Sequence, residues 1–340
     1  MLDVRRLRLL VELSRRGTLA AVAEALSYSP SSVSQQLSLL EREAGVPLLV
    51  QVGRRVQLTP QALVLVEHGK AVLDRLEEAE ADVARSLTAV GGTVRIAVFQ
   101  SAAHAVVPQA LTLLRAEHPS LRVEVTEREP ELALFDVAAR DFDLVVAEQY
   151  PGHTRAHRED LDRVHLAADT IRLALPPGPA AVPVPVPVPS GGYTIRHPGS
   201  GGGAAGAADR ISAKRDMSRA GESPLAAASD MPWVLEPQGT ASREWAEQLC
   251  RDAGFEPDVR FETADLMAHI RLIRSGNAVG LLPDLVWAGE APSVTLADLP
   301  GHPEREVFTS TRRAASARPA VAACRDALAR AARQTATPSS

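Results

Sequence analysis

Three capping signals divide the first 45 residues of this 340-residue chain into short helices, and they restrict the fold more than any other feature. Gly17 ends a run of helically spaced leucines and valines, and Thr18 follows it as a helix N-cap. Ser29 and Pro30 start another helix with a cap and a first-turn proline, and Gly45 ends it. The predicted helices cover residues 3–16, 19–26 and 30–43.

Two short strand-compatible runs follow, at residues 47–52 and 56–59. Gly53, Arg54 and Arg55 join them in a tight hairpin with a basic tip. Three helices and a hairpin form a winged helix-turn-helix, whose third helix enters the major groove of DNA. Residues 1–60 carry eight Arg against five Asp and Glu, so this segment is basic although the whole chain has a net charge of −5.

The predicted third helix carries short polar side chains opposite its apolar Val33, Leu37 and Leu40. Glutamine can bond an adenine edge through two hydrogen bonds, serine can bond a base or a phosphate, and a wing arginine can enter the minor groove. A solvated helix face would look the same, but the alanine-rich helix before it and the basic hairpin after it favour DNA. The candidate DNA-binding residues are Thr18, Ser29, Pro30, Ser31, Ser32, Ser34, Gln35, Arg54 and Arg55.

Pro60 begins a long helical pattern that continues to about residue 90. Its apolar side chains keep the three- and four-residue spacing of one helix face. A narrow apolar stripe on a polar helix is typical of a helix that pairs with another chain. The stripe consists of Val66, Gly69, Leu73, Leu76, Val83 and Leu87.

Beyond Gly91 and Gly92 the pattern changes to strands that alternate with helices, which predicts a parallel α/β sheet. Strands are expected at 93–99, 121–127 and 143–147, with helices at 101–118 and 131–139. The same alternation returns with a strand at 233–235, a helix at 241–253, a strand at 259–262, a helix at 264–275 and a strand at 278–282. This second domain is therefore interrupted.

A stretch rich in proline and glycine, at about residues 176–221, causes the interruption. Its Val-Pro alternation favours polyproline II, and its Gly/Ala tract favours a flexible chain. A surface outgrowth is preferred over a decayed sensing domain, because surface insertions cost little loop entropy. The changes of pattern divide the chain into segments 1–59, 60–90 and 93–335.

The chain resembles the LysR-type transcriptional regulators in four runs of its first 60 residues. They are GTLAAVA at 17–23, SPSSVSQQL at 29–37, LEREAGVPLL at 40–49 and LTP at 58–60. The resemblance implies a winged helix-turn-helix DNA-binding domain at 1–59, a linker helix at 60–90 that forms a homodimer, and a two-subdomain α/β effector-binding domain of the periplasmic-binding-protein type at 93–335. One subdomain is expected at about 93–164 and 268–335, and the other at about 165–267. The resemblance also implies a homotetramer that binds double-stranded operator DNA, with base or phosphate contacts at Pro30, Ser31, Ser34, Gln35 and Arg54.

One residue and one short segment depart from the family pattern. Gln35 stands where the family often has arginine, and Leu49, Val50 and Gln51 replace a segment similar to Phe-Glu-Arg before the wing. Both changes remove charge, so we expect phosphate contacts to contribute less of the DNA affinity.

The resemblance places a small-molecule effector in a cleft between the subdomains, where Gln100, Ser101 and Ala102 follow the first strand. A helix N-terminus offers free N–H groups and a positive dipole end, which favours a small carboxylate or a similar polar ligand. Further candidate effector residues are Arg128, Glu148, Thr240 and Thr263. Ordinary helix capping explains Ser101 and Thr240 equally well.

Other functional classes lack support in the sequence. No nucleophile, base and orienting group stand at a recognisable spacing, so no enzyme and no cofactor are predicted. The glycines at 201–206 match a dinucleotide motif only by chance, and His153 with His157 fits a solvated connector better than a metal site. Cys250 and Cys324 fit small buried residues rather than a redox pair.

No window is apolar enough to span a bilayer, and arginines interrupt the apolar positions of residues 1–16, which predicts a cytoplasmic protein. The sequence therefore predicts a DNA-binding transcriptional regulator that responds to a small molecule. Two alternatives remain open: a winged-helix regulator with a non-functional effector site, and a cytoplasmic solute-binding protein.

Overall fold

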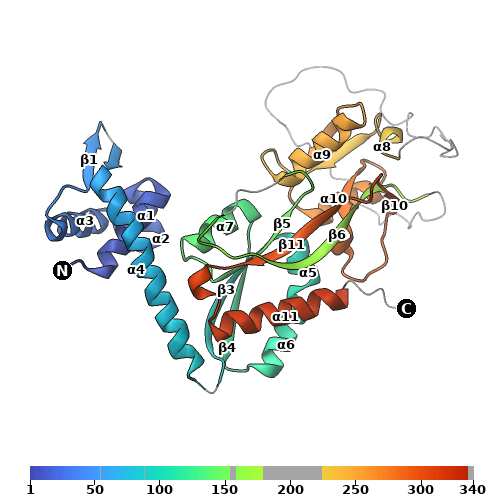
Figure 1. Cartoon of the computed structure of the whole chain (residues 1–340). Helices are drawn as coiled ribbons and strands as arrows, with labels where there is room; N and C mark the ends of the chain where they lie inside the picture. The colour runs from blue at the N-terminus through green and yellow to red at the C-terminus, as the bar shows by residue number, and fades with distance from the viewer. Residues whose placement is uncertain (54, 88, 154–157, 179–223, 336–340) are drawn as a thin grey trace, which may run out of the picture. The chain divides into compact units, whose positions relative to one another are not determined.

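The computed structural model describes residues 1–53, 55–87, 89–153, 158–178 and 224–335 (Figure 1). They form two compact units. The first comprises the described residues within 1–170, 283–291 and 304–340, and the second those within 171–282 and 292–303. Arg54, His157 and most of the Pro/Gly-rich stretch lie outside the described residues.

The chain starts with the three expected helices, α1 (Val4–Arg16), α2 (Leu19–Ala25) and α3 (Pro30–Ala44). Their capping follows the sequence signals, because Thr18 and Ser29 accept backbone hydrogen bonds, and Gly17 and Gly45 adopt positive φ angles of 75° and 72°. The wing is an antiparallel hairpin of β1 (Leu49–Val52) and β2 (Arg55–Leu58). The predicted winged helix-turn-helix is thus present in the structure.

The long helix α4 (Pro60–Arg85) ends a few residues before the predicted boundary. One half of its expected intermolecular stripe packs within the chain: Val66 and Leu73 are buried in a cluster with α1 residues. At Gly69 a Cβ would lie 3.0 Å from Cγ2 of Val11, so α1 and α4 approach closely there. The prediction that these three residues contact another chain is therefore wrong, because helical spacing does not identify the partner.

A mixed sheet forms the centre of the remaining first unit (Figure 1). Its strands are β3 (Gly92–Val98), β4 (Leu121–Glu127), β5 (Leu144–Gln149), β6 (Val164–Leu175) and β11 (Glu304–Ser310), in the order β6-β11-β5-β3-β4. The strand β3 is parallel to β4 and β5, as predicted, but β11 is antiparallel to β5 and β6. The three predicted strands are parallel to one another, but the sheet as a whole is mixed, because the prediction did not include the returning strand β11.

Helices cover both faces of this sheet. On one face, α6 (Val107–Glu117) and α11 (Pro319–Thr335) pack on Val94, Ile96 and Val98. On the other face, α7 (Pro130–Ala138) packs on Ala97 and Val145. The helix expected at 101–118 is divided at Val106, so that the short helix α5 (Gln100–Ala105) precedes α6.

The second unit contains the parallel strands β7 (Pro232–Leu235) and β8 (Asp258–Glu262). Its helices are α8 (Pro224–Ala227), α9 (Ala241–Asp252) and α10 (Leu266–Arg274). The end of β6 continues into this unit and pairs with β10 (Thr295–Asp298), while β9 (Gly280–Pro283) pairs with β6. Two short 3₁₀ helices, η1 (Asp284–Trp287) and η2 (Arg313–Ala315), complete the elements.

None of the helices in the described ranges has the length and apolar character that a membrane crossing requires.

Candidate functional site

The recognition helix α3 presents its polar face to solvent. Ser31, Ser34 and Gln35 are exposed, and Ser32 is half-buried. The opposite face buries Val33, Leu37 and Leu40 completely or nearly so. This division leaves the candidate base-reading side chains accessible, as entry into a major groove requires.

The hydroxyl groups of two candidate residues, Thr18 and Ser29, also cap helices. The Thr18 hydroxyl accepts a hydrogen bond from the Ala21 amide at 3.2 Å, and the Ser29 hydroxyl accepts one from the Ser32 amide at 3.1 Å. Both residues are exposed, as is Pro30. The helix starts that they cap direct free N–H groups outward, which suits a phosphate.

Hydrogen bonds fix the wing to the recognition helix. The Glu41 carboxylate of α3 accepts from the amides of Leu48 and Leu49 at 2.8 and 3.0 Å, and the Thr59 hydroxyl donates to the Pro47 carbonyl at 2.9 Å. Arg55 is exposed on β2 and pairs with Val52 in the hairpin register. The wing arginine Arg54 lies outside the described residues.

Gln36 differs from its neighbours on the recognition helix. Its side-chain oxygen accepts a hydrogen bond from Arg6 Nε at 2.9 Å, and Arg6 also pairs with Glu43. This contact holds α1 against α3 and occupies the Gln36 amide, so Gln35 is the better candidate for base contacts.

Four of the expected effector residues gather at the carboxyl edge of the first unit's sheet. Gln100 and Ser101 follow β3, Arg128 follows β4, and Glu148 lies near the end of β5. Because these three strands are parallel, their ends meet at one edge, where ligands bind in open α/β sheets. These four predicted residues are distant in the chain, and the fold brings them to one edge of the sheet.

A residue that the sequence prediction missed, Arg305 of β11, joins two of them. Its Nη2 donates to the Ser101 hydroxyl at 2.6 Å, its Nη1 pairs with Glu148, and its Nε donates to Asp169 at 2.8 Å. The guanidinium also lies 5.1 Å from the centre of the Phe99 ring. Ser101 and Glu148 are therefore already bonded within the protein.

This Arg305 cluster is buried and contains two carboxylates against one guanidinium. Arg305, Glu148 and Asp169 are 2%, 7% and 4% exposed. Burial by itself lowers the pKa of Arg305, but the charges of Glu148 and Asp169 outweigh it and raise the pKa above its ordinary value. Arg305 therefore stays charged.

The remaining candidates in the first unit have different surroundings. Arg128 is exposed and forms a loose ion pair with Asp136 at 3.6 Å. Gln100 is half-buried at the start of α5, and Ala102 is fully buried in the core. Ala102 can therefore shape the site only through packing.

The candidates of the second unit follow its two parallel strands. The Thr240 hydroxyl caps α9 by accepting from the Arg243 amide at 3.3 Å, and it donates to the Pro237 carbonyl at 2.9 Å. The Thr263 amide donates to the Leu235 carbonyl at 3.1 Å, and its own carbonyl accepts from His269 Nε2 at 2.7 Å. Both threonines lie at the carboxyl ends of β7 and β8, and both are partly accessible.

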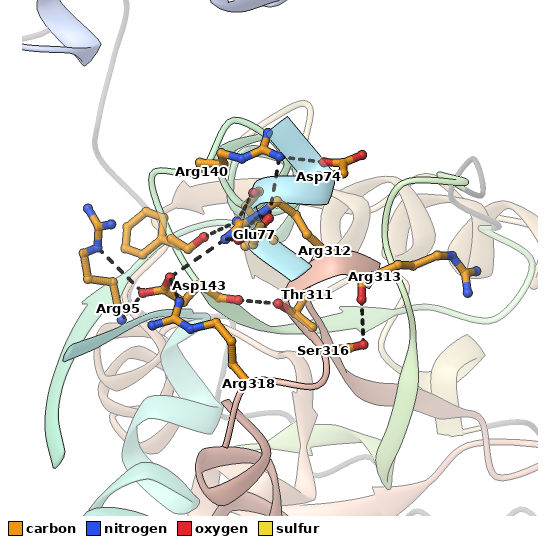
Figure 2. A network of polar contacts seen from close by, with 12 residues as sticks. Asp74, Glu77, Arg95, Arg140, Asp143, Thr311, Arg312, Arg313, Ser316 and Arg318 are labelled. Atoms are coloured by element: carbon orange, nitrogen blue, oxygen red, sulfur yellow. Dashed lines mark hydrogen bonds and ion pairs between the residues drawn. The ribbon is translucent and has the colours of Figure 1, made fainter. Parts of the chain in front are cut away.

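A buried polar network connects α4 to the sheet part of the first unit (Figure 2). Glu77 of α4 is 8% exposed and accepts from Arg312 Nη2 at 2.6 Å and from Nε at 2.9 and 3.0 Å. Arg312 also donates to the carbonyls of Val137 and Phe142 at 2.6 and 2.7 Å. Arg140 pairs with Asp74 at 2.6 Å. The linker helix is therefore held by buried charges as well as by apolar packing.

The cysteines and histidines form no reactive centre in the described part of the chain. Cys250 and Cys324 are both free and buried, and burial raises the pKa of each thiol to about 12. No group of three or more His, Cys, Asp or Glu that could hold a metal occurs among the described residues.

A winged helix-turn-helix joined by a long helix to a two-unit α/β domain defines a ligand-responsive class of DNA-binding regulators. Two family profiles match the chain: "Bacterial regulatory helix-turn-helix protein, lysR family" over residues 4–63, and "LysR substrate binding domain" over 88–189 and 212–333. The chain belongs to the LysR family of transcriptional regulators, as the sequence motifs predicted. Members of this family bind operator DNA and small-molecule effectors, form oligomers, and are not enzymes.

Individual relatives are distant but extend over most of the chain. The transcriptional dual regulator GltC of Bacillus subtilis is 24% identical over 87% of this chain and 85% of its own length. A probable hydrogen peroxide-inducible genes activator of Mycobacterium avium is 26% identical over 84% of this chain and 79% of its own. A full-length OxyR variant from Pseudomonas aeruginosa has the same fold, with a TM-score of 0.61 at 16% identity, covering 96% of this chain and 95% of OxyR.

Proposed function

We propose that this regulator reads its operator through Ser31, Ser34 and Gln35 of α3, and that Arg54 and Arg55 of the wing contact the backbone or minor groove. The observation that carries the proposal is the exposure of the α3 polar face above a fully buried apolar face. Thr18, Ser29, Pro30 and Ser32 support this contact at the two helix starts. Thr18, Ser29 and Pro30 are exposed and Ser32 is half-buried, and the unbonded N–H groups at a helix start favour phosphate.

The first prediction concerns sequence preference. Gln35→Ala and Ser34→Ala are expected to relax the preference at particular bases, at a cost of about 1–3 kcal/mol for a lost base contact. Arg54→Ala is expected to weaken binding to all sequences and to reduce the salt slope by about 1. Selection of bound sites from a random duplex pool, followed by titrations at two salt concentrations, measures both effects.

Gln109→Ala is the matched control, because Gln109 is exposed on α6 of the sheet part. Its selected sites and its salt slope should equal those of the wild type. Unchanged base preference in both α3 variants would contradict the groove assignment.

For the effector, the proposal is a small polar molecule at the carboxyl edges of the two units. Gln100, Ser101, Ala102, Arg128 and Glu148 belong to the first unit. Thr240 and Thr263 belong to the second. The N-terminus of α5 favours an anion such as a carboxylate, whereas the two carboxylates of the Arg305 cluster oppose one next to Ser101.

The Arg305 cluster also favours the second candidate function, a regulator whose effector site is non-functional. Ser101 and Glu148 already have protein partners, so no ligand is needed to satisfy them. A thermal-shift screen with matched carboxylates, neutral polyols and amines separates the candidates, because a ligand that binds only the folded protein raises its melting temperature. A rise in melting temperature that Ser101→Ala abolishes supports effector binding. If no class of compound raises the melting temperature, the second candidate is supported.

The proposed assembly is a homodimer through α4 that associates into a tetramer. Its support is the apolar part of α4 that remains exposed, namely Val72 together with Leu76 and Val83 of the predicted stripe. Leu87, the last residue of that stripe, is exposed beyond the end of the helix. Residues 1–59 would bind DNA, 60–90 would link and dimerise, and 93–335 would bind the effector. The proposed location is the cytoplasm, where a bacterial regulator of this family would reach operator DNA.

A further inference from the structure

A pocket of about 340 Å³ lies between the first two turns of α1 and the turn that joins α2 to α3. Its apolar wall consists of Leu9, Ala25 and Leu26, and its polar lining consists of Arg5, Arg8, Ser27 and Tyr28. None of these residues belongs to the proposed base-reading face of α3. The pocket therefore needs its own explanation.

The two arginines of this pocket have no partner in the part of the chain that the structure describes. Neither guanidinium forms a hydrogen bond or an ion pair there, whereas Arg6 between them is bonded to Gln36 and Glu43. The Nε of Arg8 is buried without an acceptor among the described residues. A buried donor without an acceptor is unfavourable, so this pocket suits a ligand that is rich in acceptor oxygens.

Phosphate is the ligand chemistry that fits this lining. Arginine presents a planar fork of donors that matches the oxygens of a phosphate, and Arg5 and Arg8 lie on one face of α1 at a three-residue spacing. The tyrosine hydroxyl and the serine hydroxyl are further donors in the lining. The apolar wall reduces solvent screening and strengthens the attraction between a guanidinium and an anion.

The position of the pocket near the start of the recognition helix indicates which phosphate group it would bind. Tyr28 is 49% exposed and directly precedes Ser29, the cap of the recognition helix. Its amide donates to the Ala23 carbonyl at 2.8 Å, and Ser27 has a φ of 57°, so the turn is compact. A recognition helix that enters the groove brings its N-terminus close to the flanking backbone.

We infer that Arg5, Arg8 and Tyr28 form a phosphate-binding pocket that a backbone phosphate of the bound DNA fills. The same chemistry would hold a free phosphate group. The DNA source depends on the groove assignment of the preceding subsection, whereas phosphate binding does not.

Two measurements on the full-length chain distinguish the sources. The first is the salt dependence of binding to a mixed-sequence 40-base-pair duplex, about four helical turns long, for the wild type and for Arg5→Gln/Arg8→Gln. Each lost phosphate contact should lower the slope of log K against log salt by about 0.9, or about 2 for a dimer with two pockets. The second is the melting temperature in sodium phosphate compared with sodium chloride at equal ionic strength. Phosphate stabilises proteins generally, so binding in the pocket is measured by how much more phosphate raises the melting temperature of the wild type than that of the variant.

The control variants isolate the role of the pocket. Arg115→Gln/Arg122→Gln removes the same charge from exposed positions of the sheet part and should keep the wild-type slope. Arg5→Lys/Arg8→Lys keeps both charges and should restore most of the slope. Arg5 is exposed, so Arg5→Gln alone tests the pocket if the double variant fails to fold.

Each combination of results decides the inference. A lower slope supports a DNA phosphate in the pocket. An unchanged slope, with a phosphate-specific stabilisation that the variant loses, supports a pocket for free phosphate. An unchanged slope without phosphate-specific stabilisation overturns the inference, and it leaves the base-reading proposal for α3 intact.

Discussion

The two cysteine thiols are expected to be unreactive in the folded protein, because burial and a raised pKa suppress the reactive thiolate. With a pKa of about 12, roughly one thiol in ten thousand is ionised at pH 8, compared with about one in ten for a pKa of 9. A thiol-specific disulfide reagent should label neither Cys250 nor Cys324 until the protein is unfolded in urea, when it should label both.

Ser38→Cys provides the matched control, because position 38 is exposed on α3. That thiol should react within minutes under native conditions. Rapid native labelling of either natural cysteine would contradict the prediction.

A pH effect on stability is expected at His269. Burial lowers its pKa below the ordinary 6.5, although the Thr263 carbonyl and the charge of Asp265 oppose the shift. The unfolded chain therefore takes up the proton more readily than the folded chain. The stabilisation is complete above pH 6.5 and is lost as the pH falls through the lowered pKa. Urea unfolding at pH 7.5 and 5.0 should show a larger loss in the wild type than in His269→Gln, and an equal loss would refute this assignment.

At the scale of single residues, the sequence predicted which residues gather at the sheet edge but not how they are bonded. Ser101 and Glu148 were found because both lie where a predicted strand ends. Arg305 was missed because it lies about 150 residues beyond Glu148, on a strand that no local pattern assigned. A buried arginine can be recognised only when its acidic partners are placed around it.

At the scale of elements, the junction between α4 and the sheet depends on the buried pair Glu77–Arg312 (Figure 2). Arg312→Met leaves the Glu77 carboxylate buried without its main partner, which should cost about 3–5 kcal/mol in the free energy of unfolding. The double variant Glu77→Met/Arg312→Met should regain much of this loss, since both charges are then absent. Urea titration followed by circular dichroism measures the three proteins.

Arg122→Met is the control for this junction. Arg122 pairs with Glu124 on the surface, where the two side chains are 74% and 42% exposed. Exposed pairs contribute at most about 1 kcal/mol, so this change should be small. A similar small loss for Arg312→Met would show that the network does not hold α4.

The helices were predicted well and the sheet less well, for a physical reason. Helix ends depend on capping by nearby residues, and Thr18, Ser29 and Gly45 act as the sequence indicated. The order and direction of strands depend on contacts between distant segments. The antiparallel β11 lies between β5 and β6 although about 130 residues separate it from β6, and no local signal encodes that neighbour.

For the whole molecule, the exposed stripe of α4 predicts how two chains associate. Val72, Leu76 and Val83 are 40–66% exposed and keep a spacing of four and seven residues, so they share one helix face. Leu76→Glu/Val83→Glu should shift the protein from dimer to monomer in sedimentation experiments, because burial of charged side chains in an apolar interface is unfavourable. Operator affinity should fall by more than tenfold, since two linked half-sites bind more tightly than one.

Leu132→Glu on α7 is the control, because Leu132 is 55% exposed and lies outside α4. This variant should remain dimeric. A dimer that survives both α4 substitutions would exclude this stripe as the interface.

The sequence by itself determined the parts whose physics is local: the capped helices, the basic hairpin, the polar face of α3 and the change to strand–helix alternation after Gly92. Only the tertiary structure decided which partner each surface meets. Val66, Gly69 and Leu73 have the spacing of an intermolecular stripe, yet they pack on α1 of the same chain. Periodicity specifies that a face is buried, whereas the identity of the covering surface depends on residues far away in the chain.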